Sequence, residues 1–338
     1  MTVLTLGRRY TAALMLALAV LASASPATLA WGKDGHAIVA DIAARQLSRA
    51  AAKHVATLLD GKSMASVSSW ADDIRVWQKK PTGPPPDTLA DDPVAAAFVA
   101  AAGNETQPSW HYADLPLGTL TYDPTGLGAG PNDIVHALNR CIAVLQTGRD
   151  PLPGGSIDPP QALRLVIHYV ADIHQPLHAA CGYWTAGPTG AVLEPLAMAS
   201  KGVDDRGGNS IRYGRGKYDN LHALWDVHMV DVALAGRTPQ DFITDAVADL
   251  RAGRVPAGTL PGKPADLPAK WIVDSAAQAS AVYAGVDTTQ VTIGPDSAFT
   301  GQAALSLTYD TDHKQLAVTQ LARAGARLAA LLNALWPG

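Results

Sequence analysis

The sequence predicts an all-α protein built as a single multi-helix domain. Alanine is abundant, β-branched and aromatic runs of strand length are scarce, and apolar residues recur with a helical period. Candidate functional residues lie on both sides of every Pro- and Gly-rich loop, which argues against a linker between domains. Helices are expected at residues 35–60, 66–78, 93–101, 132–146, 159–178, 217–235, 239–252, 264–284 and 312–336.

The first thirty residues have the pattern of a signal peptide. Arg8 and Arg9 precede an apolar run over residues 11–22, and small residues follow as far as Ala30. The apolar run is too short to span a membrane. We therefore expect cleavage before Trp31, a secreted or periplasmic location, and one mature domain over residues 31–338. Cleavage removes two arginines and no acids, so the formal net charge changes from −4 to −6.

The helix expected at 159–178 contains the most informative stretch of the chain. An apolar run over residues 162–167 leads into three histidines and one carboxylate within eleven residues, His168 to His178. His168 and Asp172 are four residues apart and so share one helical face. Burying both without partners costs several kcal/mol, on the order of 2–7 per polar group. Pro176 bends or ends the helix and can turn His178 towards the same centre. The stretch indicates either a metal site or a histidine-rich core helix with local hydrogen bonds.

A second pair with the same spacing strengthens the metal interpretation. His222 and Asp226 repeat the His-x3-Asp pattern on the helix expected at 217–235. Facing helices of a bundle build multinuclear metal sites from such residues. The final helix, by contrast, shows an ordinary amphipathic stripe that predicts core packing; the stripe comprises Leu316, Leu321, Ala324, Leu328, Leu331 and Leu335.

Four further motifs are weak when each is taken alone. A free terminal amine and its own carbonyl can chelate a metal, but an ordinary N-terminus is the simpler explanation. A helical Asp–Arg pair is usually a surface ion pair worth under about 1 kcal/mol, and a Gly-Gly pair is often just a turn. The motifs are Trp31 with His36, Asp72 with Arg75, the run His111-Tyr112-Ala113-Asp114, and Gly207-Gly208 before Asn209.

The cysteine content leaves two alternatives open. Cys141 and Cys181 can pair in an oxidising compartment, closing a long loop worth about 3–4 kcal/mol. Alternatively, Cys141 is an inert core thiol on an apolar helix face. The chain has no CxxC motif, which disfavours zinc ligation by cysteine. No basic patch marks a nucleic-acid-binding surface either, so charge alone does not indicate nucleic acid.

Taken in chain order, these motifs resemble the trinuclear zinc nucleases of the P1/S1 type, which share a superfamily with bacterial zinc phospholipases C. The resemblance covers nearly the whole mature chain and implies the helical fold of that superfamily, with three Zn²⁺ ions in a cleft. Nine expected ligand positions are filled in order: Trp31, His36, Asp72, His111, His168, Asp172, His178, His222 and Asp226.

The resemblance also implies how these residues divide their roles. One zinc takes Asp72, His111, His168 and Asp172. A second takes His178, His222 and Asp226. The third takes the Trp31 amine and carbonyl with His36, and Asp172 bridges the third zinc to the first. Asp114 and Arg75 support catalysis beside the phosphate, Tyr112 occupies the position of a base-stacking aromatic, and Asn209 faces the substrate.

The leading functional hypothesis is a secreted zinc-dependent endonuclease and 3′-nucleotidase. It would cleave single-stranded DNA and RNA to 5′-phosphorylated products through a water that zinc activates. Stacking requires an unpaired base, so single strands are the expected substrates. The alternatives are a zinc phospholipase C and a non-catalytic exported zinc-binding protein. The Trp31-x4-His36 opening favours the nuclease, as does Asp226 where the phospholipases tend to have Glu.

Overall fold

The computed structural model describes residues 31–79, 82–101, 108–214, 218–258 and 262–338, so the expected signal peptide lies outside the described residues. The chain is mostly helical, as predicted. Its α-helices are α1 (Gly32–Ala44), α2 (Arg49–Leu58), α3 (Trp70–Gln78), α4 (Pro93–Ala100), α5 (Ile134–Thr147), α6 (Pro159–Asp172), α7 (Pro176–Ala179), α8 (Leu221–Ala223), α9 (Met229–Leu234), α10 (Pro239–Arg251), α11 (Leu267–Val282) and α12 (Tyr309–Leu335).

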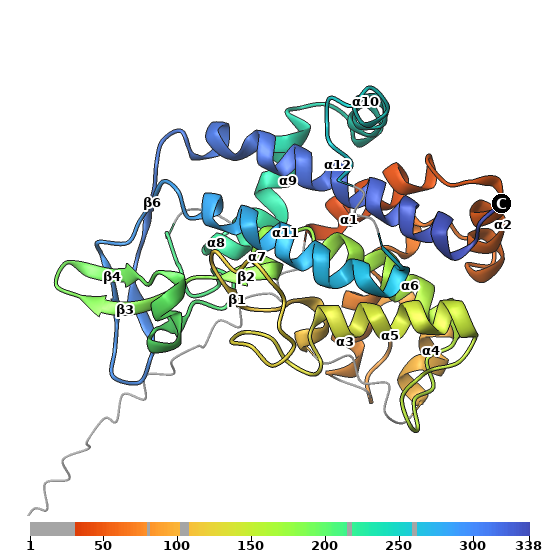
Figure 1. The fold of residues 1–338 in the computed structure, drawn as a ribbon, viewed down its shortest axis with the longest axis horizontal. Coiled ribbons are helices and arrows are strands. Elements are labelled where there is room, and N and C mark those ends of the chain that lie inside the picture. The colour runs from red at the N-terminus through yellow and green to blue at the C-terminus, as the bar shows by residue number, and fades with distance from the viewer. Residues whose placement is uncertain (1–30, 80–81, 102–107, 215–217, 259–261) are drawn as a thin grey trace, which may run out of the picture.

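Helix α6 forms the centre of the hydrophobic core. Every residue from Gln161 to Asp172 is buried, and α1, α3, α5 and α12 all pack against the helix. Its start is fixed by a capping box, in which the Asp158 side chain accepts from the Gln161 amide and the Gln161 side chain accepts from the Asp158 amide. Helix α11 lies between α12 and α5, and these three run lengthwise across the molecule (Figure 1). The predicted stripe on α12 faces this core, with Leu321 and Leu328 fully buried.

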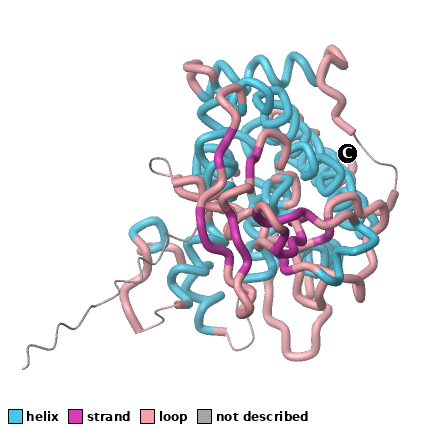
Figure 2. The backbone as a smooth tube through the Cα atoms, turned by 90° about the vertical axis from the view of Figure 1, so that its left-hand side faces the viewer, coloured by secondary structure: helices cyan, strands magenta, loops and turns pink. Residues whose placement is uncertain are grey.

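Short strands gather at one end of the molecule, which the sequence did not predict (Figure 2). Residues 182–203, where no regular structure was expected, contain most of a three-stranded antiparallel sheet in the order β4-β3-β5. The remaining strands form two-stranded pairs, one of which, β1 with β2, is parallel. The strands are β1 (Leu115–Pro116), β2 (Ala180–Cys181), β3 (Tyr183–Gly187), β4 (Gly190–Leu193), β5 (Val203–Asp204), β6 (Val286–Asp287), β7 (Val291–Ile293), β8 (Phe299–Gly301) and β9 (Ala304–Leu305).

Two expected helices are interrupted, so their predicted extents were wrong. The helix expected at 35–60 is divided into α1 and α2, because Ser48 is extended and its side chain caps the amide of Ala51. The helix expected at 159–178 ends at Asp172, and α7 begins at Pro176 after an extended Gln175. A residue before proline is disfavoured in helical conformation, which explains the second break.

Of the two alternatives left open for the cysteines, the structure shows no disulfide between Cys141 and Cys181: both are buried free thiols. Cys141 packs in the main core, on α5, whereas Cys181 lies in a separate small cluster with Tyr183. The Cys181 thiol donates to the Asp114 carbonyl at 3.4 Å. Within the described ranges, no helix has the length and apolar character needed to cross a membrane.

Candidate metal centre

Asp172, at the end of α6, is the point on which three histidines converge. Its Oδ2 lies 3.1 Å from His168 Nε2, one turn earlier on the same helix, and 2.9 Å from His111 Nδ1. Its Oδ1 lies 3.2 Å from Nε2 of His36 on α1. All four side chains are buried. The His-x3-Asp spacing therefore does place both side chains at one site, to which distant segments add further ligand atoms.

Asp72 on α3 joins the same cluster from a fourth segment. Its Oδ2 lies 3.7 Å from His168 Nε2 and its Oδ1 lies 3.8 Å from His111 Nδ1. Arg75, one turn further on α3, donates to Asp72 Oδ1 at 2.9 Å. The Arg75 side chain is only 14% exposed, so this pair is not the ordinary surface ion pair that the sequence alone suggested.

A second group of ligand atoms forms where α7 meets the segment that follows α8. His178 Nε2 lies 3.7 Å from Asp226 Oδ1, and His222 Nε2 lies 3.3 Å from Asp226 Oδ2. Asp226 belongs to a π-helical segment, Leu224–His228, between α8 and α9. Such widened turns occur often at functional sites.

The side chains fall into three groups whose ligand atoms lie within 4.8 Å of one another, consistent with a trinuclear site. The third group has the residues expected around the second zinc, His178, His222 and Asp226. The first two groups share His168, on which His36 stacks with ring centroids 4.1 Å apart. How the ligands divide among three ions stays a prediction. The groups are His36–Asp72–His168, His111–His168–Asp172 and His178–His222–Asp226.

Backbone carbonyls set the ring orientation of three of these histidines. The Nδ1–H of His168 donates to the Ser68 carbonyl at 2.7 Å, and that of His178 donates to the His111 carbonyl at 2.8 Å. The Nδ1–H of His222 donates to the Gly207 carbonyl at 2.7 Å. Each bond leaves Nε2 as the nitrogen that faces the cluster, which is the arrangement that metal-binding histidines usually show.

Several buried atoms of the cluster have no hydrogen-bond partner, and this supports a fit to metal ions. The His36 Nε2–Asp172 Oδ1 pair is close but is not aligned as a hydrogen bond, so neither atom is satisfied. Ligand atoms bound at 2.0–2.1 Å to one tetrahedral zinc lie roughly 3.3 Å apart, similar to the His–Asp distances above. Imidazole nitrogen and carboxylate oxygen are donors that suit zinc. The unpartnered atoms include His36 Nδ1 and Nε2, Asp72 Oδ2, Asp172 Oδ1, His178 Nε2 and Asp226 Oδ2.

Burial and mutual charge control the protonation of these ligands. Burial lowers the pKa of His111 to about 4 and also lowers the pKa of His36 and His222. Burial opposes charge on His168 too, but the carboxylates of Asp172 and Asp72 outweigh it and raise the pKa of His168 to about 9. Metal ligation requires neutral imidazole, so three of these rings are held in the binding form and His168 must release a proton.

Gln175 supports the group of His178, His222 and Asp226, a role that no sequence pattern indicated. The fully buried side chain donates from Nε2 to Asp226 Oδ1 at 2.7 Å and accepts the Leu177 amide at 2.6 Å. It therefore caps α7, which carries His178, and also holds Asp226 from a segment 51 residues away.

Gly207 is the other supporting residue. Its φ is +60°, and a Cβ there would lie 2.3 Å from the Leu177 carbonyl oxygen. Only glycine fits this turn, and the turn presents the carbonyl that orients His222. The Gly-Gly pair found in the sequence is thus more than an ordinary turn.

Trp31 is fully buried and contacts the neighbours of two candidate ligands. Its Nε1–H donates to the carbonyl of Ala171, the neighbour of Asp172, at 3.1 Å. A Cβ on the next residue, Gly32, would lie 3.2 Å from the Asp226 carbonyl oxygen. The backbone at the expected mature terminus therefore packs against the backbone of Asp226.

The other residues predicted to act beside the phosphate have distinct local environments. Tyr112 follows His111 directly and is half-buried. Burial, followed by the charges of Asp204 and Asp205, raises the pKa of Asp114 to about 7. Asn209 Nδ2 donates to the Arg206 carbonyl at 2.8 Å, which fixes the amide in the turn that contains Gly207.

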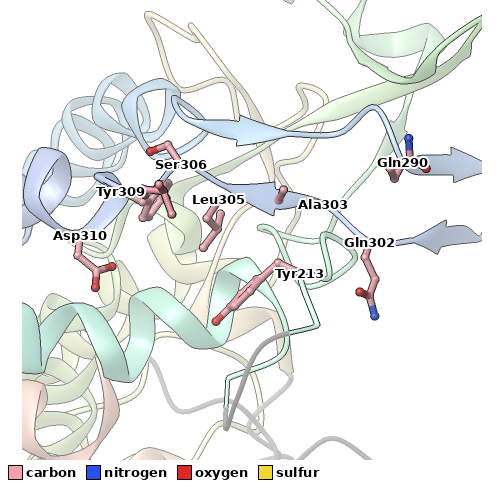
Figure 3. Close-up of a pocket in the computed structure, with 10 residues that line it drawn as sticks. Tyr213, Gln290, Gln302, Ala303, Leu305, Ser306, Tyr309 and Asp310 are labelled. Carbon is pink, nitrogen blue, oxygen red and sulfur yellow. The ribbon is translucent and has the colours of Figure 1, made fainter.

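A separate cavity of about 540 Å³ lies away from the ligands, between the β6–β9 region and α12 (Figure 3). Tyr213, Gln290, Gln302 and Asp310 line it, and it contains none of the metal-ligand candidates. Its wall residue Tyr309 accepts from Trp225 Nε1 at 3.0 Å, and the Trp225 ring lies 6.5 Å from that of Trp31. Tyr309 thus links the wall of the cavity to Trp225, the residue before Asp226.

A mostly helical domain that gathers three buried His/Asp groups, each able to hold a metal ion, defines a protein with a candidate multinuclear metal centre. More specifically, the chain belongs to the S1/P1 nuclease family, whose model matches residues 31–337. It is 26% identical over 312 residues to Nuclease S1 of Aspergillus oryzae, covering 90% of this chain and 92% of that protein. It is 24% identical over 313 residues to Nuclease P1 of Penicillium citrinum, covering 90% of this chain and 97% of that protein. It is 26% identical over 219 residues to Endonuclease 2 of Arabidopsis thaliana, covering 63% of this chain and 60% of that protein.

Proposed function

We propose that this chain is a zinc-dependent endonuclease and 3′-nucleotidase that hydrolyses single-stranded DNA and RNA to 5′-phosphorylated products. The observation that carries the proposal is the convergence of three buried His/Asp groups in a chain that aligns with nucleases along 90% of its length. We infer three Zn²⁺ ions because the donors are imidazole and carboxylate and no cysteine takes part.

The charges of the centre suit an anionic substrate. The side-chain ligands include three carboxylates, Asp72, Asp172 and Asp226. Three divalent ions would therefore leave the centre with a positive surplus, which favours binding of a phosphodiester. When bound, zinc supplies Lewis-acid chemistry: it polarises the phosphate ester and lowers the pKa of water at the site.

The protein's own residues divide the remaining work. The Asp114 carboxylate has a pKa of about 7, so it can accept a proton from attacking water at neutral pH. Arg75 is held by Asp72 and places positive charge beside the group that is hydrolysed. The Tyr112 ring, half-buried next to His111, provides a stacking surface for an unpaired base, worth roughly 1–3 kcal/mol.

We also propose export and cleavage before Trp31. A free amine at Trp31 would complete the third site, and the family match begins at that residue. N-terminal sequencing of the exported protein should begin at Trp31; another first residue would exclude the amine as a ligand.

The test combines metal analysis with activity on purified protein. Zinc-loaded protein should contain three ions, cleave single-stranded DNA faster than duplex, release phosphate from 3′-AMP, and lose these activities in EDTA. His36→Ala should lose one ion and most activity. His54→Ala is the matched control, because His54 stacks on Trp336 and belongs to none of the three ligand groups. Fully loaded protein that leaves both nucleic acid and 3′-AMP intact would refute the proposal, and hydrolysis of phosphatidylcholine alone would point to the phospholipase.

A further inference from the structure

The turn over residues 204–209 is rigidly anchored beside the metal centre. The buried Asp205 carboxylate accepts from the Gly208 amide at 2.9 Å, from Trp184 Nε1 at 2.8 Å and from the Tyr283 hydroxyl at 3.0 Å. Gly207 packs so closely against Leu177, the residue before His178, that a Cβ at Gly207 would lie 2.3 Å from the Leu177 carbonyl oxygen. The turn thus has little freedom, and any side chain on its outer surface has a defined position relative to the ligands.

Arg206 is the exposed side chain of this turn, between the buried Asp205 and Gly207. Its φ is +58°, a left-handed conformation that is uncommon for a residue other than glycine. Its carbonyl accepts both from the Asn209 amide at 3.3 Å and from Asn209 Nδ2 at 2.8 Å. The backbone bonds hold this conformation and direct the side chain outward.

The turn lies directly beside one of the ligand groups. The carbonyl of Gly207, the residue after Arg206, accepts from Nδ1 of His222 at 2.7 Å. The Arg206 backbone is therefore one residue away from a direct contact with the group of His178, His222 and Asp226, and its exposed side chain starts from that position.

Arg206 differs from Arg75 and Lys33 in having no carboxylate partner among the described residues. Asp72 holds Arg75 at 2.9 Å, and Asp73 holds Lys33 at 3.8 Å. Among the residues that the structure describes, no ion pair engages the Arg206 guanidinium. A guanidinium group that no carboxylate occupies is well suited to bidentate binding of a phosphate, because its N–H donors lie in one plane.

We propose that Arg206 binds a phosphate group of a polynucleotide one nucleotide away from the bond that is cut. The inference rests on the proposed nuclease function and adds to it a basis for preferring polynucleotides over 3′-mononucleotides. A 3′-mononucleotide offers a single phosphate, which the metal centre takes, whereas an oligonucleotide offers a second phosphate within reach of the turn.

The experiment compares Arg206→Gln with Arg254→Gln on two substrates over a series of NaCl concentrations. Arg254 is exposed and paired with Asp249, so its replacement removes the same charge at an unrelated place. For a single-stranded oligonucleotide, Arg206→Gln should lower kcat/KM about tenfold, mainly through KM, as expected for one charge-assisted hydrogen-bonded contact. The plot of log kcat/KM against log salt should become less steep by about 0.7.

On 3′-AMP, Arg206→Gln should match the wild type, as should its zinc content and thermal stability. Arg206→Lys should keep the salt slope but recover only part of the affinity. Equal losses on both substrates, a loss of zinc, or unchanged oligonucleotide kinetics would each overturn the role of Arg206. If wild-type protein cleaves neither substrate, the proposed function itself fails, and this outcome is distinct from the others.

Discussion

Replacing Gln175 with Met should weaken one metal site while removing a measurable amount of stability. The substitution keeps the length of the side chain but removes its donor to Asp226 and its acceptor for the Leu177 amide. A hydrogen bond to a charged group contributes about 1.5–3 kcal/mol and a helix cap about 1 kcal/mol. We therefore expect a loss of about 3 kcal/mol in the free energy of unfolding. Loss of a residue that positions a metal ligand typically costs 10- to 100-fold in metal affinity.

The matched control is Gln320→Met. Gln320 is also fully buried, donates to the His174 carbonyl at 2.8 Å and accepts from Arg323 at 3.2 Å, but touches none of the ligands. Chemical denaturation in EDTA should show similar destabilisation of both variants. Competition with a chelator, and the visible spectrum of the Co²⁺-substituted protein, should show one altered site in Gln175→Met alone. If Gln175→Met retains three ions with wild-type affinity, Gln175 does not position Asp226.

Three further predictions concern the same region. Gly207→Ala should abolish zinc binding at the His222 site, because the new Cβ would lie 2.3 Å from the Leu177 carbonyl oxygen. The control Gly61→Ala, at a φ of +74° with open space around it, should lower the free energy of unfolding by only about 1 kcal/mol and leave the zinc content unchanged. Equal zinc contents of the two variants would contradict the prediction. Burial raises the pKa of Asp205 from 3.8 to about 6, so the folded state binds a proton at this carboxylate more tightly than the unfolded state does. The stability that this bound proton contributes is therefore lost as the pH rises from about 4 to about 6. Asp205→Asn should flatten this part of the Tm–pH curve while lowering Tm throughout, and an unchanged slope would exclude the effect. Chelation should lower Tm by roughly 5–10 °C and excess Zn²⁺ should restore it, since ions that bind only the folded state stabilise it; a Tm insensitive to EDTA would mean that the groups do not bind metal.

The spacing of side chains along a helix made the clustering of the candidate ligands predictable. His168 with Asp172, and His222 with Asp226, lie one turn apart, and the break before Pro176 brings His178 into the second group. The division of the candidate ligands among three ions stays a prediction, because spacing within a segment does not determine how segments meet. The stacking of His36 on His168 depends on the contact of α1 with α6.

The supporting residues and the strands left no comparable pattern. The role of Gln175 depends on the orientation of its side-chain amide towards Asp226, and the role of Gly207 depends on its carbonyl, which accepts from His222. Neither feature produces a periodic pattern in the sequence. Strands of two residues, such as β1 and β2, are too short to show alternation. Ser48 caps α2 within an otherwise continuous helical pattern, which is why the first break was missed.

The π-helical turn at Leu224–His228 sets a strict limit on chain length in this part of the protein. It accommodates one residue more than an α-helical turn of the same rise. Deleting a single residue between His222 and Asp226 would restore ordinary winding and reduce their spacing from four residues on a widened turn to three on a tighter one. The 3.3 Å approach of His222 Nε2 to Asp226 Oδ2 would then be lost, even though every ligand was still encoded. Natural variants and engineered versions of this protein should therefore tolerate substitutions in this segment far better than insertions or deletions.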